Sequence, residues 1–250
     1  MSSLGDKLDL QKAYRNWFDR AARAMPRKQA AEYAIGGEFH AYGVVQSEML
    51  RFYGMRDEDY LVDVGCGSGR TAQPLAASHK GRYLGTDLVP ELVDYARSLC
   101  NRPDWRFEVV TGLQIPEADG VADFVCMFSV LTHLLHEQSY LYLEDARRVL
   151  KPGGKIVFSF LEFRQPYHWD VFGATVEAAR ASNDRPLNVF IDRDAIGAWA
   201  SHLDLKVEDI RDGHDAFVPL ASPLTLEGGH VLEHFGNVGQ SICVLSRPEG

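Results

Sequence analysis

Residues 61–70 read LVDVGCGSGR, a short apolar segment followed by a turn rich in glycine. The first four residues are valine or leucine apart from Asp63, which predicts a buried strand. Glycine has no Cβ atom, so Gly65, Gly67 and Gly69 allow a ligand to lie against the backbone where a helix begins. The stretch therefore predicts a strand, a ligand-binding turn and a helix start in succession.

The same alternation of strands and helices continues along the chain. We expect strands at 60–64, 82–86, 105–110, 122–128, 155–161, 206–210 and 240–245, and helices at 39–53, 71–77, 90–100, 140–150 and 192–203. Strands that alternate with helices are typical of a parallel sheet with crossover helices. We therefore predict an α/β fold, in which a doubly wound, Rossmann-like sheet of seven mostly parallel strands has helices on both faces.

Two regions flank this predicted sheet. Residues 8–33 carry apolar groups at helical spacing, interrupted by Pro26, and predict an N-terminal helical cap. Residues 162–186 contain many aromatic side chains without one clean period, and we interpret them as an insertion over the active face. The run from 212 to 239 is too long for a simple hairpin turn, so we expect a lid or a surface loop there.

Composition limits the kinds of partner. The 250 residues include 26 Lys and Arg against 35 Asp and Glu, a formal charge of −9. Such a balance disfavours broad attraction to nucleic acid or an anionic membrane, so we expect a small-molecule partner, no nucleic acid and no membrane. The absence of a long apolar run and of a signal-peptide core predicts a cytoplasmic protein. No pattern indicates the oligomeric state.

The cysteines and histidines give no metal-binding pattern. The four cysteines, Cys66, Cys100, Cys126 and Cys243, include no CxxC pair, which predicts buried reduced thiols. The nine histidines do not join them in a ligand spacing. We therefore predict no metal site.

The residues after the glycine turn indicate which nucleoside ligand is suitable. Asp87 ends the next predicted strand, where a carboxylate can accept both hydroxyls of a ribose, or can cap the helix that follows. A dinucleotide site has the pattern GxGxxG, whereas here the third glycine, Gly69, comes one residue early and Arg70 takes its place. NAD is disfavoured, and so is nucleoside triphosphate hydrolysis, because no GxxxxGK[ST] loop is present.

With these motifs the chain resembles the class I S-adenosylmethionine-dependent methyltransferases, in their small-molecule branch. The resemblance covers about residues 60–161, and residues 147–155, RRVLKPGGK, are similar to a structural turn of that family. It implies S-adenosylmethionine as cofactor and an antiparallel last strand near the sheet edge, for which 240–245 is placed. No internal repeat, low-complexity tract or linker appears, so we expect one domain over 1–250, with a cap at 1–55, a cofactor-binding core at 56–161, and the substrate-side insertion and final strands at 162–250.

The resemblance also implies roles for individual residues. The methionine part of the cofactor would contact Asp63 and the turn, the ribose Asp87, the adenine Leu88, and the methyl donor the end of the fourth strand. In full, the implied cofactor-binding residues are Asp63, Gly65, Cys66, Gly67, Gly69, Asp87, Leu88, Gly112, Leu113, Phe128 and Ser129.

Two residues are candidates for catalysis. A hydroxyl acceptor needs a base, and a histidine with a near-neutral pKa is the natural choice. His133 follows the fourth strand, where some O-methyltransferases of the resembled family place such a base; the alternative is that it only orders a helix. Glu162, after the fifth strand, is suited to orient a base or bind the acceptor, or else only pairs with a basic side chain.

Aromatic side chains outside the predicted core are candidates for acceptor binding. Tyr14 and Trp17 lie in the cap and Tyr167 and Trp169 in the insertion, and each alternatively packs in a core. The function that we predict is methyl transfer to oxygen or nitrogen of a small metabolite such as a sugar or a secondary metabolite. A protein methyltransferase and a non-catalytic cofactor-binding module remain as alternatives.

Overall fold

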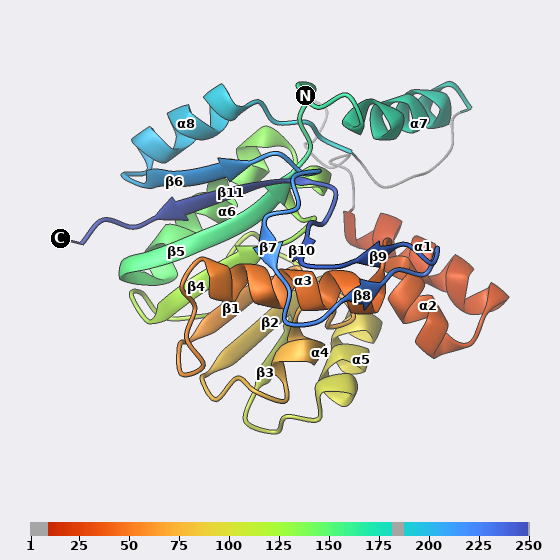
Figure 1. The fold of residues 1–250 in the computed structure, drawn as a ribbon, viewed down its shortest axis with the longest axis horizontal. Helices are drawn as coiled ribbons and strands as arrows, with labels where there is room; N and C mark the ends of the chain where they lie inside the picture. The colour runs from red at the N-terminus through yellow and green to blue at the C-terminus, as the bar shows by residue number, and fades with distance from the viewer. Residues whose placement is uncertain (1–9, 182–187, 250) are drawn as a thin grey trace, which may run out of the picture.

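A seven-stranded sheet runs through the middle of the molecule (Figure 1). The computed structural model describes residues 10–181 and 188–249, without the side chains of residues 10–14 and 17. The strand order is β3-β2-β1-β4-β5-β11-β6. The bounds are β1 Leu61–Val64, β2 Tyr83–Asp87, β3 Arg106–Val109, β4 Ala122–Met127, β5 Leu150–Phe160, β6 Lys206–Arg211 and β11 Ser241–Ser246.

The direction of the strands agrees with the predicted class. β1 to β5 pair in parallel, and β11 lies antiparallel between β5 and β6. β1 and β11 are buried along their whole length, because helices cover both faces of the sheet. The Rossmann-like α/β fold and the antiparallel last strand are therefore confirmed.

The helices divide between the two faces. One face is covered by α3 Phe39–Phe52, α4 Ala72–Leu75 and α5 Pro90–Cys100, and the other by α6 His136–Val149 and α8 Arg193–His202. Each face has its own apolar core, in which Met49 and Val93 pack on one side and Leu143 and Ile196 on the other. The burial of these side chains is the main favourable contribution to the sheet–helix packing.

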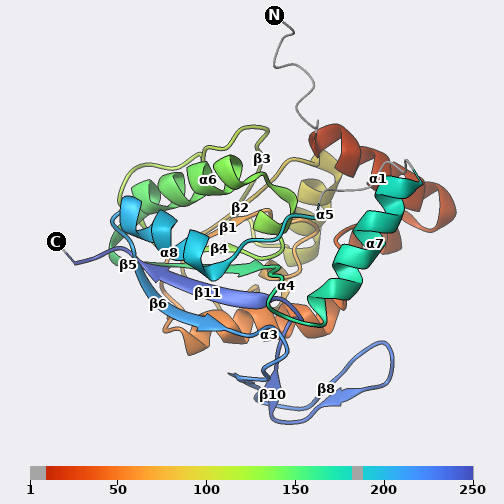
Figure 2. The same cartoon turned by 90° about the horizontal axis from the view of Figure 1, so that it is seen from above.

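The predicted N-terminal cap forms two helices. α1 Leu10–Ala24 and α2 Arg27–Ala34 are separated at Pro26, whose ring cannot continue a helix. They pack beside α5 at one side of the sheet, where α1 and α2 lie side by side (Figure 2). The cap thus meets the end of the sheet at which β1 and β2 finish.

Two segments differ from their expected structure. Within 162–186 the sequence predicted no regular element, but α7 His168–Arg180 is a helix. Residues 212–240, which we call the strap, contain two small antiparallel pairs: β7 Val218–Pro219 with β10 Phe235–Gly236, and β8 Leu224–Thr225 with β9 Val231–Leu232. The strap crosses α3 and extends beyond the sheet (Figure 2).

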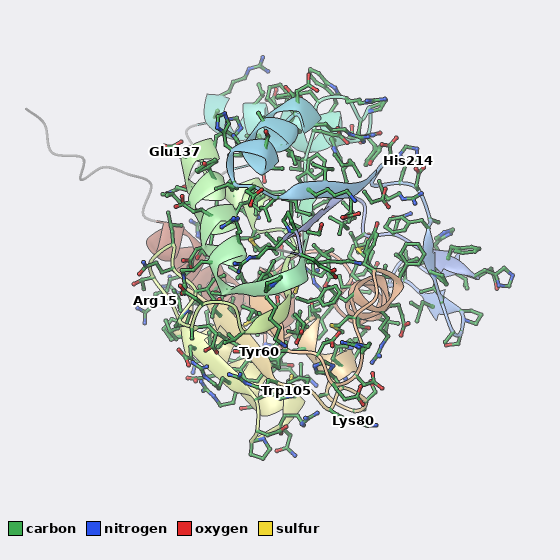
Figure 3. The ribbon with its side chains drawn as sticks, turned by 90° about the vertical axis from the view of Figure 1, so that its left-hand side faces the viewer. Arg15, Tyr60, Lys80, Trp105, Glu137 and His214 are labelled. Atoms are coloured by element: carbon green, nitrogen blue, oxygen red, sulfur yellow. The ribbon has the colours of Figure 1, made fainter. Side chains whose placement is uncertain are left out.

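The two ends of the parallel strands differ in what they carry. Figure 3 faces the amino ends, where Tyr60 and Trp105 directly precede β1 and β3. The carboxyl ends point toward the cap, α7 and the strap (Figure 1). All four cysteines are buried and free. In the described part of the chain, no helix is long and apolar enough to cross a bilayer.

Candidate functional site

A cavity of about 1090 Å³ lies at the carboxyl ends of β1, β2 and β4. The chain crosses from one half of the sheet to the other between β1 and β4, and ligands of open α/β sheets bind at such a switch point. The cap, the glycine turn and the end of the strap contribute to its walls.

The glycine turn after β1 forms the floor of the cavity. Gly65 and Gly67 have φ angles of 69° and 53°, which L side chains rarely adopt. A Cβ atom on Gly65 would lie 2.4 Å from Val130 Cγ2, and one on Gly67 would lie 2.7 Å from Ile35 Cγ2. Gly69 does not line the cavity; its absent Cβ lets α5 approach, since that atom would lie 3.0 Å from Ala96 Cβ.

Asp87 lies at the tip of β2 on the cavity wall. The backbone N–H of Gly67 donates to its Oδ2 at 3.0 Å, and that of Val89 donates to its Oδ1 at 2.9 Å. Burial raises the pKa of Asp87, although these hydrogen bonds favour the charged form. The Leu88 backbone N–H also donates to this carboxylate, which has about four acceptor sites, so Asp87 can still accept from a ligand hydroxyl group.

Asp63 lies deeper, with 2% of its surface exposed. Its Oδ2 accepts a hydrogen bond from the Tyr83 hydroxyl at 2.7 Å. Burial raises the pKa of this carboxyl to about 6, because a desolvated carboxylate is costly. At neutral pH, Asp63 therefore places a negative charge beneath the cavity.

The third helix of the chain is fastened to the glycine turn. Arg70 is buried; its Nη1 donates to the Gly36 carbonyl at 2.6 Å, and burial lowers its pKa to about 10. The Thr71 hydroxyl donates to Gln46 Oε1 at 2.9 Å. Gly43 of α3 allows this close packing, because a Cβ there would lie 2.4 Å from the Arg70 carbonyl oxygen.

The end of β4 also reaches the cavity. Phe128 and Ser129 line it, as does His133 from the short 3-10 helix Leu131–His133, while Cys66 and Leu88 line it after β1 and β2. The structure thus brings eight of the predicted cofactor residues and the predicted base to one cavity. The eight are Asp63, Gly65, Cys66, Gly67, Asp87, Leu88, Phe128 and Ser129.

Glu162 lies outside the lining of the cavity. Its carboxylate accepts from Arg193 Nε at 2.9 Å, from Arg193 Nη2 at 2.7 Å and from the Ser241 hydroxyl at 2.5 Å. Burial opposes the charge, but these hydrogen bonds hold the pKa of Glu162 below its ordinary value. The geometry corresponds to the alternative of pairing with a basic side chain.

The remaining predicted residues whose side chains the structure describes do not line the cavity. Trp169 is half exposed, and its Nε1 donates to the Phe163 carbonyl at 3.1 Å; the Tyr167 ring packs on His214. Gly112 and Leu113 follow β3, and the Gly112 carbonyl accepts from the Tyr142 hydroxyl. The side chains of Tyr14 and Trp17 lie outside the described part of the structure.

Several lining residues carry no motif that sequence reasoning could use. Among the described residues around the cavity, Glu32, Glu38 and Glu227 add carboxylates to Asp63 and Asp87, against the single guanidinium of Arg70. The only sequence signal for Arg70 was its place directly after the last glycine. An acidic cavity with a glycine floor and a carboxylate after β2 fits a cationic nucleoside such as S-adenosylmethionine.

A Rossmann-like sheet with a glycine turn after β1 and a carboxylate after β2 defines a nucleoside-binding domain. Residues 62–158 match the family model described as a methyltransferase domain. This matched segment is similar to the methyltransferase domain family, and the sheet that contains it has the fold of class I S-adenosylmethionine-dependent methyltransferases.

Curated relatives match over the same part of the chain. The demethylmenaquinone methyltransferase of Tropheryma whipplei is 31% identical over 119 residues, which cover 46% of this chain and 46% of that protein. The chloroplastic tocopherol O-methyltransferase of Arabidopsis thaliana is 30% identical over 120 residues, which cover 44% of this chain and 34% of that protein. The matches therefore span less than half of each relative.

Solved structures extend the likeness to most of the fold. A SAM-dependent methyltransferase from Methanosarcina mazei superimposes with a TM-score of 0.58 at 14% identity, covering 80% of this chain and 98% of that one. At this identity, the likeness establishes the fold.

Proposed function

We propose that this protein transfers a methyl group from S-adenosylmethionine to oxygen or nitrogen of a small-molecule acceptor. The observation that carries the proposal is the position of Asp87 on the wall of the cavity, beside the open glycine turn. Asp87 would hold the ribose hydroxyls, and the turn and Asp63 would hold the methionine part. When bound, the cofactor supplies a methyl group on a sulfonium sulfur, which is already a good leaving group.

The volume of the cavity lies at the upper end of the range for ligand pockets. Single ligand sites commonly enclose roughly 300–1,000 Å³, and this one encloses about 1090 Å³. Holding the acceptor in register with the methyl donor can contribute about 7 to 11 kcal/mol in well-oriented reactions. The main task of the chain is therefore to position the acceptor, in keeping with the small-molecule substrates in the names of the relatives.

His133 is the residue proposed to take the proton of a hydroxyl acceptor. It lies on the cavity wall after β4, close to Ser129 and Val130 in the chain. We assign cofactor binding to residues 56–161, and acceptor recognition to the cap at 1–55 and to 162–250 within the same domain. Glu162 is given no part in the reaction, because Arg193 and Ser241 occupy its carboxylate.

Calorimetric titration with S-adenosylmethionine, S-adenosylhomocysteine, NAD and ATP tests the cofactor. We expect heat of binding from the two adenosyl-sulfur compounds alone. At 100 times its dissociation constant, each should also raise the free energy of unfolding by about 2.7 kcal/mol. Asp87→Ala is expected to abolish cofactor binding. Asp119→Ala, at a carboxylate with 79% of its side chain exposed, serves as the control and should bind as the wild type does. Binding of NAD alone contradicts the proposal.

A radiolabelled methyl-transfer assay over a panel of phenols, sugars and amines tests the reaction. His133→Ala is expected to keep cofactor affinity and to lower turnover of hydroxyl acceptors by about 10²- to 10⁴-fold. Unchanged turnover removes His133 as the base. Cofactor binding without transfer to any acceptor favours the non-catalytic module instead.

A further inference from the structure

A short hydrogen-bond relay joins β4, β5 and β11 beside the cavity. The Ser129 backbone N–H donates to Ser159 Oγ at 2.7 Å, and Ser159 Oγ lies 2.6 Å from Gln240 Oε1. Ser129 Oγ also donates to Gln240 Oε1, at 3.3 Å. In this arrangement both serine hydroxyls donate to the amide oxygen of Gln240, and Ser159 Oγ in turn accepts from the Ser129 backbone.

The other end of the amide is thereby assigned as well. Because Oε1 accepts from the two serines, the Nε2 group with its two protons is the part of the amide that remains for other partners. Gln240 is one of the residues that line the cavity. Across residues 10–181 and 188–249, no group accepts a hydrogen bond from Nε2. Gln240 thus lines the cavity with an amide whose oxygen is held by two serines and whose N–H groups remain available to a ligand.

The strand order places this donor away from the ribose site. Ser129 follows β4, which is two strands from the β2 tip that carries Asp87, and Ser159 lies in β5, three strands away. Neighbouring strands are ~4.8 Å apart, so the relay lies roughly 10 to 14 Å from Asp87 along the sheet. His133 also follows β4, so Gln240 belongs to the half of the cavity that contains the proposed base.

Gln240 is held rigidly at both sides of the chain. The carbonyl of Gly239 accepts from His168 Nε2 at 3.3 Å, and the Ser241 hydroxyl donates to the buried Glu162 carboxylate at 2.5 Å. Ser129 has a φ of 59°, a left-handed conformation that costs a non-glycine residue about 1–2 kcal/mol. Strain that is maintained by surrounding bonds is characteristic of functional sites.

We propose that Gln240 selects and orients the acceptor by donating its Nε2–H to an oxygen of that molecule. The acceptor would then carry a carbonyl, ether or hydroxyl oxygen near the atom that receives the methyl group. The inference rests on the proposed function for the identity of the acceptor, but oxygen recognition by Gln240 can be measured without methyl transfer.

The side-chain amide of Gln240 can be followed by NMR in protein with ¹⁵N-labelled glutamine. Its signals are assigned as those missing from Gln240→Met, which has a similar length and no donors. With S-adenosylhomocysteine bound, catechol and cyclohexanone are titrated as oxygen-bearing probes, and toluene as the oxygen-free probe. We expect catechol or cyclohexanone to shift the Gln240 signals, and toluene to leave them in place.

The variants give the affinity side of the same test. Gln240→Met is expected to weaken the oxygen-bearing probe by about 2- to 12-fold, the usual range for a neutral hydrogen bond, and to leave toluene unchanged. Ser159→Ala releases Oε1 and is expected to weaken the same probe by a smaller factor. S-adenosylhomocysteine affinity should change less than probe affinity in both variants, because the relay lies roughly 10 to 14 Å from Asp87 along the sheet.

The outcomes separate this inference from the proposed function. Failure of both oxygen-bearing probes to bind, unmoved Gln240 signals, or equal probe affinity in Gln240→Met overturns the role of Gln240. If the shifts and affinities are as expected but no acceptor is methylated, oxygen recognition stands and methyl transfer is rejected. If methyl transfer occurs with unmoved Gln240 signals, the proposed function stands and this inference falls.

Discussion

Replacing Asp63 by asparagine is expected to stabilise the fold. The carboxyl is 2% exposed, and burial raises its pKa from 3.8 to about 6. Because each pKa unit corresponds to 1.36 kcal/mol, the ionised form costs the folded protein about 3 kcal/mol at neutral pH. Asparagine removes the charge and retains an oxygen for the Tyr83 hydroxyl, which now donates at 2.7 Å. We expect the free energy of unfolding to rise by about 3 kcal/mol at pH 7.5.

The pH dependence gives the prediction its sharpest test. A raised pKa means that folded wild-type protein holds a proton between pH 3.8 and 6 that the unfolded chain releases, so this carboxyl becomes less favourable as pH rises through that window. The advantage of Asp63→Asn should therefore fall to about 1.5 kcal/mol at pH 5. Urea unfolding at both pH values measures it, with Asp215→Asn, at a 55% exposed side chain, as control. A less stable Asp63→Asn at pH 7.5, or an equal gap at both pH values, refutes the reasoning.

Three further predictions concern backbone space and the buried ion pair. Gly65→Ala should lower the free energy of unfolding by about 2 kcal/mol or more and prevent S-adenosylhomocysteine binding, because its Cβ would meet Val130 at a positive φ; normal melting and calorimetric affinity would contradict this. Gly173→Ala, in helix α7 with open space around the new Cβ, should instead raise the free energy of unfolding by about 0.5–1 kcal/mol in urea. Glu162→Gln should destabilise by about 1–3 kcal/mol, since Arg193 loses its buried carboxylate partner and keeps only Asp212. Because the pKa of Glu162 is lowered in the folded protein, the stability that Glu162 contributes is present above pH 4.5 and is lost as the pH falls through its folded-state pKa. If Glu162→Gln lowers cofactor affinity more than it lowers the free energy of unfolding, Glu162 has a role in the site.

The parts of the fold that the sequence predicted are those in which local pattern and tertiary environment agree. Residues 61–64 form an apolar run because both faces of the sheet are covered, and the glycines that follow are needed where φ is positive. Pro26 separates helices α1 and α2 because its ring cannot continue a helix, whatever the helices pack against. Such signals are contained within a few residues, so one sequence is enough to read them.

Helix α7 was not predictable in the same way. Its described side chains are buried only at His168 and Ala178, so no apolar stripe with the helical period marks it. The strap pairs are two residues long each, below the length at which alternation is visible. The predicted cytoplasmic location and the assignment of Gly112 and Leu113 to the adenine stay predictions.

In the candidate site, too, some residues are close together in the sequence and others are brought together only by folding. Asp87 and the glycine turn lie within twenty-two residues along the chain, inside the segment 62–158 that the family model matches. Gln240 reaches Ser129 across 111 residues, and Glu38 bonds the strap at Glu227 across 189. The acceptor half of the cavity therefore combines His133 and Ser129 of the matched segment with groups such as Gln240 that lie outside it. This is the physical reason why the motifs predict a cofactor, whereas the identity of the acceptor depends on groups such as Gln240 that only the folded chain brings together.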